Sequence, residues 1–346
     1  MNQDWQNLLE QQGAHFQDGV VQHFGNPAAE LLAARDGTML CDLSQFGAIK
    51  VAGEEAQKFL QNLLSNDINA VNSTTSQLSS FNSAKGRMLA TFLIWQQGGN
   101  YLLQLPRSLT AAMHKKLAMY VLRAKVKVSD ASDELACMGI AGVNAEALIK
   151  QHFNLTLEQD NTVGQHNDTT VIRLSAQRYL ISTTPQQAIT LWNNLSSAAK
   201  PAGSSCWDWL NIRAGIPVVT PATQEQFVLQ MANLDILDGV SFKKGCYPGQ
   251  EIVARTHYLG KQKRRMYLAH IEAESAPVAG NEVFSADMPA QPCGMVINAC
   301  AAPGGGFDLL AVMQINSHDT QKIHLQSVQG AELQFLLMPY SLSSVE

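Results

Sequence analysis

The chain has 346 residues, of which 46% are hydrophobic and 15% are charged, and its formal net charge is −5. This length exceeds what one hydrophobic core usually fills, so we expect two or three domains. The weak overall charge argues against strong nucleic-acid binding, and we predict no direct contact with nucleic acid. No apolar run approaches the ~20 residues that a membrane span needs, so we predict no membrane association.

The start of the chain and its cysteines indicate the cellular compartment. Residues 1–5 lack the basic start and the apolar block of a signal peptide. The six cysteines are too few and too scattered for a disulfide framework in a chain of this length. Cys293 and Cys300 fall in one predicted strand, seven residues apart, which puts them on opposite faces and disfavours a shared metal. We therefore predict a cytoplasmic protein without a stably bound metal.

The first part of the chain predicts helices and then a strand. Residues 1–36 are expected to be helical, with an interruption at Gly25-Asn26-Pro27. Residues 40–51 alternate between two faces, which predicts one strand and places Phe46 as a bulky ring on its polar face. A neighbouring helix that covers the ring would explain Phe46 without a ligand. Residues 53–64 combine two carboxylates in the first turn with an apolar stripe, which predicts a helix packed on that strand.

The middle of the chain alternates strands and helices. Residues 81–92 predict a turn that leads into a strand, and a hairpin follows through Gly98-Gly99-Asn100. A helix at 110–123 and a strand at 125–128 complete a block at about 37–128, and strands and helices alternate similarly in a second block at about 134–195. The two blocks show no detectable sequence repetition, and they predict an α+β fold.

A short predicted helix at 206–214 carries two tryptophans. Trp207 and Trp209 are two residues apart, which is about 200° of helical rotation, so they cannot share one face. Trp209 lies with apolar neighbours and is expected in the core. Trp207 lies on the side of Asn211, and a large ring on a partly polar face is a surface position, a domain contact or a platform for a ligand.

The densest run of unusual residues is 238–255, with the sequence D-G-V-S-F-K-K-G-C-Y-P-G-Q-E-I-V-A-R. Pro248-Gly249 can form a tight turn or open a helix, and we predict the helix. Cys246 would then lie just outside a helix N-terminus. There the helix dipole and the ammonium groups of Lys243 and Lys244 favour the thiolate over the thiol. The alternative interpretation is a small buried cysteine in a turn.

This run resembles a family signature. The segment from Asn233 to about Arg265 is similar to the K-G-C-Y-x-G-Q-E motif of the YgfZ family, folate-binding relatives of the glycine-cleavage T-protein. Weaker similarity at 207–217 and 41–44 extends the resemblance to about residues 30–346. Around Cys246 the motif residues are Lys243, Lys244, Gly245, Tyr247, Gly249, Gln250, Glu251 and Arg255.

The resemblance implies a domain arrangement. We expect an N-terminal helical extension at 1–36 and a T-protein-like folate-binding region of ferredoxin-like α+β units at 37–262, with subdomains at about 37–130 and 131–262. From Met266 onward, short alternating strands separated by glycine and proline predict a small C-terminal β-barrel at 263–346. The basic window at 261–265 is by default a solvated strand, and next to Cys246 it could also bind a folate polyglutamate tail or a phosphate.

The resemblance also implies site residues. Phe46 and Trp207 fall where family members place aromatic rings against the folate, so tetrahydrofolate or a one-carbon derivative is expected between them. The T-protein has acidic residues where this chain has Met88-Leu89-Ala90, which cannot take a proton, so we do not expect aminomethyl transfer. Arg213 replaces the glutamate that is usual in its motif.

The function implied by the resemblance is the maintenance of iron–sulfur enzymes, including enzymes that modify tRNA. Cys246 would react with, or transiently ligate, a cluster or an activated carbon unit. Clusters usually need four thiolates, so iron–sulfur enzymes or assembly factors are expected as transient partners. The alternatives are an aminomethyltransferase or demethylase of the T-protein type, a thiol redox enzyme in which Cys41, Cys137 or Cys206 pairs with Cys246, and a structural adaptor that binds no folate.

Overall fold

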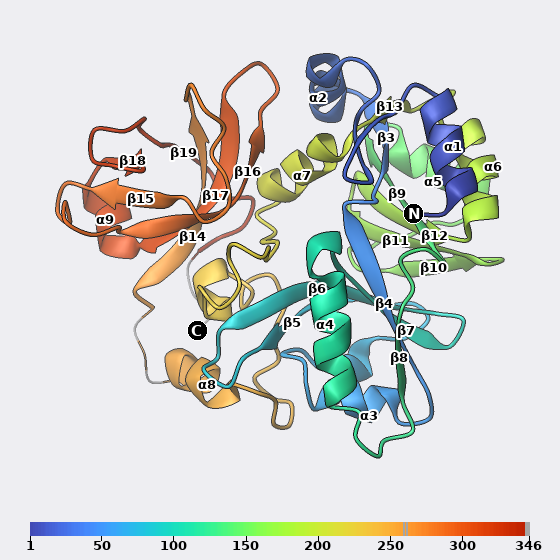
Figure 1. Ribbon diagram of the computed structural model, residues 1–346, viewed down its shortest axis with the longest axis horizontal. Helices are drawn as coiled ribbons and strands as arrows, with labels where there is room; N and C mark the ends of the chain where they lie inside the picture. Colours follow the sequence, from blue (N-terminus) through green and yellow to red (C-terminus); the bar gives the residue numbers. More distant parts are fainter. Residues whose placement is uncertain (259, 261, 343–346) are drawn as a thin grey trace. The chain divides into compact units, whose positions relative to one another are not determined.

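The computed structural model describes residues 1–258, 260 and 262–342 (Figure 1). The described residues form two compact units that interleave along the chain. Unit 1 is Met1–Phe59, Ile68–Gln77 and Leu93–Trp207, and unit 2 is Leu60–Asp67, Leu78–Phe92 and the described residues from Asp208 onward. None of the helices in the described part of the chain combines the length and the apolar character that crossing a membrane requires.

The N-terminal segment contains a hairpin between its two helices. Helix α1 (Gln3–Gln11) is capped by the Asn2 side chain, and α2 spans Pro27–Asp36. Between them, β1 (His15–Gln17) pairs with β2 (Val20–His23) in an antiparallel hairpin. Asp18 and Gly19 form its two-residue turn with φ angles of 52° and 75°, as the tightest hairpin turns require. The prediction that residues 1–36 are helical apart from an interruption at Gly25-Asn26-Pro27 is therefore wrong for the hairpin between the two helices.

Unit 1 is built around a six-stranded sheet in the order β10-β11-β12-β9-β3-β13. Its strands are β3 (Thr38–Asp42), β9 (Ala136–Gly142), β10 (Val163–His166), β11 (Thr169–Ser175), β12 (Arg178–Thr183) and β13 (Lys200–Ala202). Helices α5 (Ala145–Phe153) and α6 (Pro185–Leu195) contribute buried side chains to its core, as does α1. The ring of Trp5 on α1 meets Trp192 on α6 edge to face at 5.4 Å.

A second sheet has the order β5-β6-β7-β4-β8. Its strands are β4 (Phe46–Ala52), β5 (Gln77–Asn82), β6 (Met88–Gln97), β7 (Asn100–Pro106) and β8 (Lys127–Asp130). Helix α4 (Arg107–Met119) packs on β4, β7 and β8. The short α3 (Ala56–Gln61) is the only helical part of the predicted helix at 53–64 that the structure describes.

The predicted single strand at 40–51 is two strands in different sheets. The chain turns at residues 43–45, where the backbone N–H of Ser44 donates to Asp42 Oδ2 at 3.0 Å and the N–H of Phe46 donates to the Leu43 carbonyl at 3.0 Å. A side chain that bonds its own backbone two residues on is a recurrent turn signal. The alternation of the two side-chain faces continues through residues 43–45, so it predicted one strand instead of two strands joined by a turn.

Unit 2 contains an antiparallel six-stranded sheet in the order β18-β15-β16-β17-β14-β19, which curls into a half-barrel (Figure 1). Its strands are β14 (Arg264–Ile271), β15 (Glu282–Ser285), β16 (Gly294–Ala301), β17 (Phe307–Gln314), β18 (Ile323–Leu325) and β19 (Gln334–Leu336). The remaining elements are η1 (Ile68–Ala70), α7 (Ser204–Arg213), η2 (Leu229–Ala232), α8 (Gln250–Tyr258) and α9 (Ile315–Thr320). The predicted α+β class with a C-terminal β region is confirmed. The domain limits at 36, 130 and 262 stay predictions.

Candidate functional site

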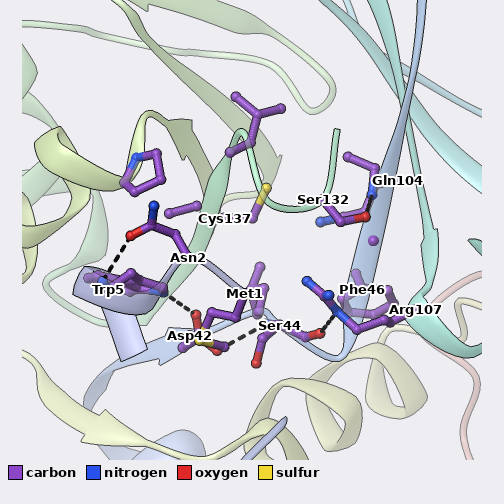
Figure 2. A pocket seen from close by; sticks show the side chains of 16 residues that line it. Met1, Asn2, Trp5, Asp42, Ser44, Phe46, Gln104, Arg107, Ser132 and Cys137 are labelled. Carbon is purple, nitrogen blue, oxygen red and sulfur yellow. Dashed lines mark hydrogen bonds between the residues drawn. The ribbon is translucent and has the colours of Figure 1, made fainter. Parts of the chain in front are cut away.

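A small cavity in unit 1 lies beside Phe46 (Figure 2). It has a volume of about 20 Å³, which is room for a water molecule. Its walls come from the segment that starts α1, the turn after β3, the strand β4, the end of β7 and the start of β9. The polar side chains that line it are Asn2, Asp42, Ser44, Gln104, Arg107, Ser132 and Cys137.

Asp42 is a buried carboxyl group at the end of β3. Trp5 Nε1 donates to its Oδ1 at 2.9 Å, and the Ser44 N–H donates to its Oδ2. Burial raises the pKa of Asp42, and these hydrogen bonds partly oppose the rise. The guanidinium of Arg107 lies on the same side of the cavity, where its Nε donates to the Ser44 carbonyl at 2.8 Å (Figure 2).

Two further polar groups, the Gln104 amide and the Cys137 thiol, line the cavity. The side-chain Nε2 of Gln104 is buried and donates no hydrogen bond within the described part of the chain. Burial raises the pKa of the Cys137 thiol to about 12, so this cysteine is a protonated, inert lining group at neutral pH. A buried amide donor without a partner is costly, and an acceptor atom on a ligand would satisfy it.

Phe46 and Trp207 both lie in unit 1, but they have different surroundings. Phe46 is half-buried and lines the cavity. Trp207 is only 2% exposed. It is not one of the described residues that line the cavity. Its ring covers Gly139, where a Cβ would come within 2.4 Å, and the guanidinium carbon of Arg178 lies 4.7 Å from the ring centroid. The expectation that Trp207 stands outside the core is therefore wrong.

The Cys246 segment lies in unit 2. Helix α8 begins at Gln250, so Pro248-Gly249 forms a turn before the helix and not its first turn. Gly249 has a φ of 77°, and a Cβ there would come within 2.5 Å of both the Gly86 Cα and the Ser83 carbonyl oxygen. Only glycine fits this left-handed position against the turn before β6. Cys246 itself is exposed, which removes the interpretation of a buried turn cysteine.

Lys244 does not have the surroundings that we expected. It is buried, and its ammonium donates to three backbone carbonyls: Gln61 at 2.7 Å, Leu64 at 2.5 Å and Asn66 at 3.0 Å. Burial lowers the pKa of Lys244 to about 8. The charge is thus directed to the last residue of α3 and to the residues just after it, and Lys244 anchors the loop. Lys243 is exposed.

The other motif residues divide by burial. Tyr247 is buried, and burial raises the pKa of its hydroxyl. The exposed positions of the motif are Gly245, Glu251 and Arg255, and Gln250 is half-buried. The motif therefore combines anchoring residues with an exposed surface around Cys246.

The basic window is not a uniform solvated strand. Lys261 lies outside the described residues. Arg265 is buried, and its two terminal guanidinium nitrogens form a bidentate ion pair with the Asp235 carboxylate oxygens at 2.7 and 2.9 Å. The guanidinium also donates to the Gln230 carbonyl. Lys263 is exposed and Arg264 is half-buried, so only these two positions remain for an anionic ligand in the described part of the window.

The segment expected to stand in place of the T-protein acids is apolar core. Met88, Leu89 and Ala90 at the start of β6 are all buried. Arg213 lies 3.5 Å from Asp308, which also accepts a hydrogen bond from Trp209 Nε1 at 2.8 Å. Trp209 is buried, as predicted.

Sequence reasoning missed most of the groups around the Phe46 cavity. Gln104 is a polar residue in the apolar run Leu102–Leu105 of β7, and a buried glutamine there was a detectable signal. Arg107 and Cys137 carried no such signal, because their proximity depends on the pairing of distant strands. Within the described residues, no group of three or more histidine, cysteine, aspartate or glutamate side chains could hold a metal, and none of the six cysteines there forms a disulfide.

Comparison with known proteins gives consistent results. The family model of the GCVT N-terminal domain matches residues 11–237. The tRNA-modifying protein YgfZ of Colwellia psychrerythraea is 30% identical over 315 residues, which cover 90% of this chain and 96% of the relative. The protein of the same name from Serratia proteamaculans is 29% identical over 88% of this chain and 93% of its own length.

A solved structure agrees at the level of the fold. The glycine cleavage system aminomethyltransferase T from Bartonella henselae superimposes with a TM-score of 0.76 at 15% identity, covering 96% of this chain and 95% of that chain. The prediction from the K-G-C-Y-x-G-Q-E motif is confirmed, and the chain belongs to the YgfZ family, with a GCVT N-terminal domain.

Proposed function

We propose that this protein binds a reduced folate at the Phe46 cavity and thereby supports tRNA modification. The observation that carries the proposal is the buried Gln104 Nε2, which finds no hydrogen-bond partner among the described residues and lies beside Phe46 and Asp42. A pterin ring presents an aromatic face together with an edge of donors and acceptors. Phe46 offers a stacking partner, Gln104 a donor, and Asp42 an acceptor.

The cavity of about 20 Å³ is much smaller than a pterin ring, so binding requires one wall to move. Met1, Asn2 and Trp5 form the wall that comes from the start of the chain (Figure 2). Displacing them would free Asp42 Oδ1 from its bond to Trp5 and leave that oxygen for the ligand. The ring of Trp207 is buried and does not line the cavity, so only the family resemblance supports a contact between Trp207 and folate.

Calorimetry with tetrahydrofolate and with its 5-formyl and 5-methyl derivatives tests the proposal. Phe46→Ala should weaken binding by about 1–3 kcal/mol, the range for losing an aromatic ring stacked on a base. Phe16→Ala, a half-buried phenylalanine of β1 in the same unit that packs on the core, is the matched control and should bind normally. No heat of binding for any of the three folates, with the protein folded, rejects the proposal.

We further propose that the exposed Cys246 thiol is the group that serves iron–sulfur enzymes in the cytoplasm, and that the protein does not catalyse aminomethyl transfer. The exposure of Cys246 and the buried apolar Met88-Leu89-Ala90 segment support both statements. Cys246→Ser should leave folate affinity unchanged while iron–sulfur enzyme activity in cells falls. Steady production of methylene-tetrahydrofolate from an aminomethyl donor would contradict the second statement.

A further inference from the structure

The exposed side of α4 carries large apolar side chains. The opposite side packs on the sheet through Leu109, Thr110, Met113 and Leu117. At the end of the helix and just after it, Met119 is 70% exposed, Tyr120 44% and Leu122 89%. Leu122 also has a φ of 48°, a left-handed conformation that is uncommon for leucine. A cluster of exposed large apolar residues on a water-facing surface commonly marks an interaction site.

The surface next to these residues is hollowed. A shallow hollow of about 390 Å³ is lined by Ala112, Lys115, Lys116, Met119 and Tyr120. Ala112, the pair Lys115 and Lys116, and then Met119 with the C-cap residue Tyr120 follow one another at intervals of three or four residues, so they lie along one face. The small side chain of Ala112 leaves space between the large, mainly apolar side chains of Met119 and Tyr120 and the two lysines. Lys115 and Lys116 supply positive charge. α4 lies in front of the sheet in Figure 1.

The charge around the hollow is opposite to that of the whole chain. Residues 107–129 contain six lysines and arginines and no aspartate or glutamate, although the chain has a net charge of −5. Two of these six charges are paired, because Glu54 lies 2.8 Å from the Lys125 ammonium and Asp133 lies 3.7 Å from the Arg107 guanidinium. In the described part of the chain, Lys115, Lys116 and Arg123 take part in no ion pair. The local positive charge is therefore available to a partner.

We propose that this face of α4 docks an acidic, amphipathic segment of a partner protein. A large apolar side chain of the segment fills the hollow against Met119 and Tyr120, and its carboxylates pair with Lys115 and Lys116. Apolar anchors in a groove supply most of the affinity in such complexes, and charges at the rim supply orientation and association rate.

The charge and shape distinguish this partner from two others. A symmetric dimer through this face would bring two cationic surfaces together, because a two-fold interface pairs the same patch on both copies. An anionic bilayer would pair with the lysines but would leave the concave hollow unfilled. An acidic segment with an apolar side chain satisfies both the charge and the hollow.

Selection of random dodecapeptides displayed on phage, against the full chain, tests the proposal. We expect enriched peptides to contain a large apolar residue flanked by aspartate or glutamate. The double variant Lys115→Glu/Lys116→Glu and the single variant Met119→Ser should each bind a synthetic copy of such a peptide at least about tenfold more weakly. Binding should also weaken as salt is added.

The matched controls are Lys150→Glu and Val143→Ser, which change an exposed lysine and an exposed apolar residue elsewhere in the same unit. Both should bind the peptide normally. The proposal is overturned if no peptide is enriched, if enriched peptides lack acids, or if the α4 variants bind them as well as the controls do. Vesicles of phosphatidylcholine with one-quarter phosphatidylglycerol that bind in place of peptides, or self-association lost in Met119→Ser, would also overturn it.

Discussion

Replacing Lys244 with methionine should loosen the loop that carries Cys246 without deactivating the thiol. The substitution keeps an unbranched stem and removes the ammonium, so the carbonyls of Gln61, Leu64 and Asn66 lose their donor. A hydrogen bond that involves a charged group contributes roughly 1.5–3 kcal/mol, and the desolvation of the ammonium offsets part of the sum. We expect the free energy that holds the Cys246 loop against residues 61–66 to fall by about 2–4 kcal/mol.

Amide hydrogen exchange measures this loss where it occurs. The N–H of Ser241, three residues before Lys244, donates to the Ser65 carbonyl at 3.1 Å and reports on the same contact. Its exchange rate should rise by about 30-fold or more, since each 1.4 kcal/mol is a factor of ten. Global stability, measured by urea denaturation, should fall in parallel. Lys243→Met removes an exposed neighbouring ammonium and should change neither quantity.

Alkylation separates the anchoring role of Lys244 from an activating one. In a variant that keeps only Cys246, the rate of reaction with iodoacetamide should stay within about twofold after Lys244→Met, because the ammonium is directed to backbone carbonyls and the thiol is already exposed. A large fall in alkylation rate with unchanged Ser241 exchange would refute the anchoring argument. It would restore the activating role first expected from the sequence.

Three further predictions concern packing, backbone conformation and pH. Trp207→Ala should lower the free energy of unfolding by about 3–5 kcal/mol in urea denaturation, since the ring is buried; a change below about 1 kcal/mol would contradict its place in the core. Gly249→Ala should destabilise the protein because φ is 77° and Gly86 leaves no space. Gly245→Ala should be nearly neutral, because a Cβ there meets no described atom within 4 Å apart from its chain neighbours; equal effects would count against the turn. Burial raises the pKa of Asp42 above its usual 3.8, so the folded chain holds a proton that the unfolded chain releases, and stability should fall as pH rises above about 4. Asp42→Asn should lack this fall in urea midpoints, and an identical pH profile in both proteins would disprove the assignment.

Local sequence signals were sufficient for the family motif, for the C-terminal β region and for the core position of Trp209. Two turns were missed although their chemistry was present in the sequence. Asp18-Gly19 is a strong hairpin signal, but the strands on either side are only three and four residues long. The Asp42 side chain bonds the Ser44 N–H and ends β3, yet the alternating pattern on both sides of this turn predicted one strand.

The remaining misses depend on contacts between residues that are distant in sequence. Strand β3 pairs with β9, so Cys41 lies opposite Gly139, about a hundred positions later in the chain. That pairing brings Cys137 near Asp42, and no local pattern indicates it. The carbonyls that bind the Lys244 ammonium likewise lie at and just after the end of α3, some 180 residues earlier in the chain. Periodicity predicts which face of an element is buried, but it does not predict which element covers that face.

The K-G-C-Y-x-G-Q-E segment contains three residues that fix its backbone and one exposed thiol. Lys244 binds three carbonyls, Tyr247 is buried, and Gly249 adopts a conformation that only glycine fits against Gly86. These three residues hold the segment on unit 2 from both sides of Cys246. The thiol between them is exposed, and the neighbouring Gly245 has open space around it. A small, unhindered glycine beside an exposed thiol leaves room for a bulky reactant to approach the sulfur. Lys244, Tyr247 and Gly249 therefore anchor the segment on both sides of Cys246, and the thiol between them stays exposed.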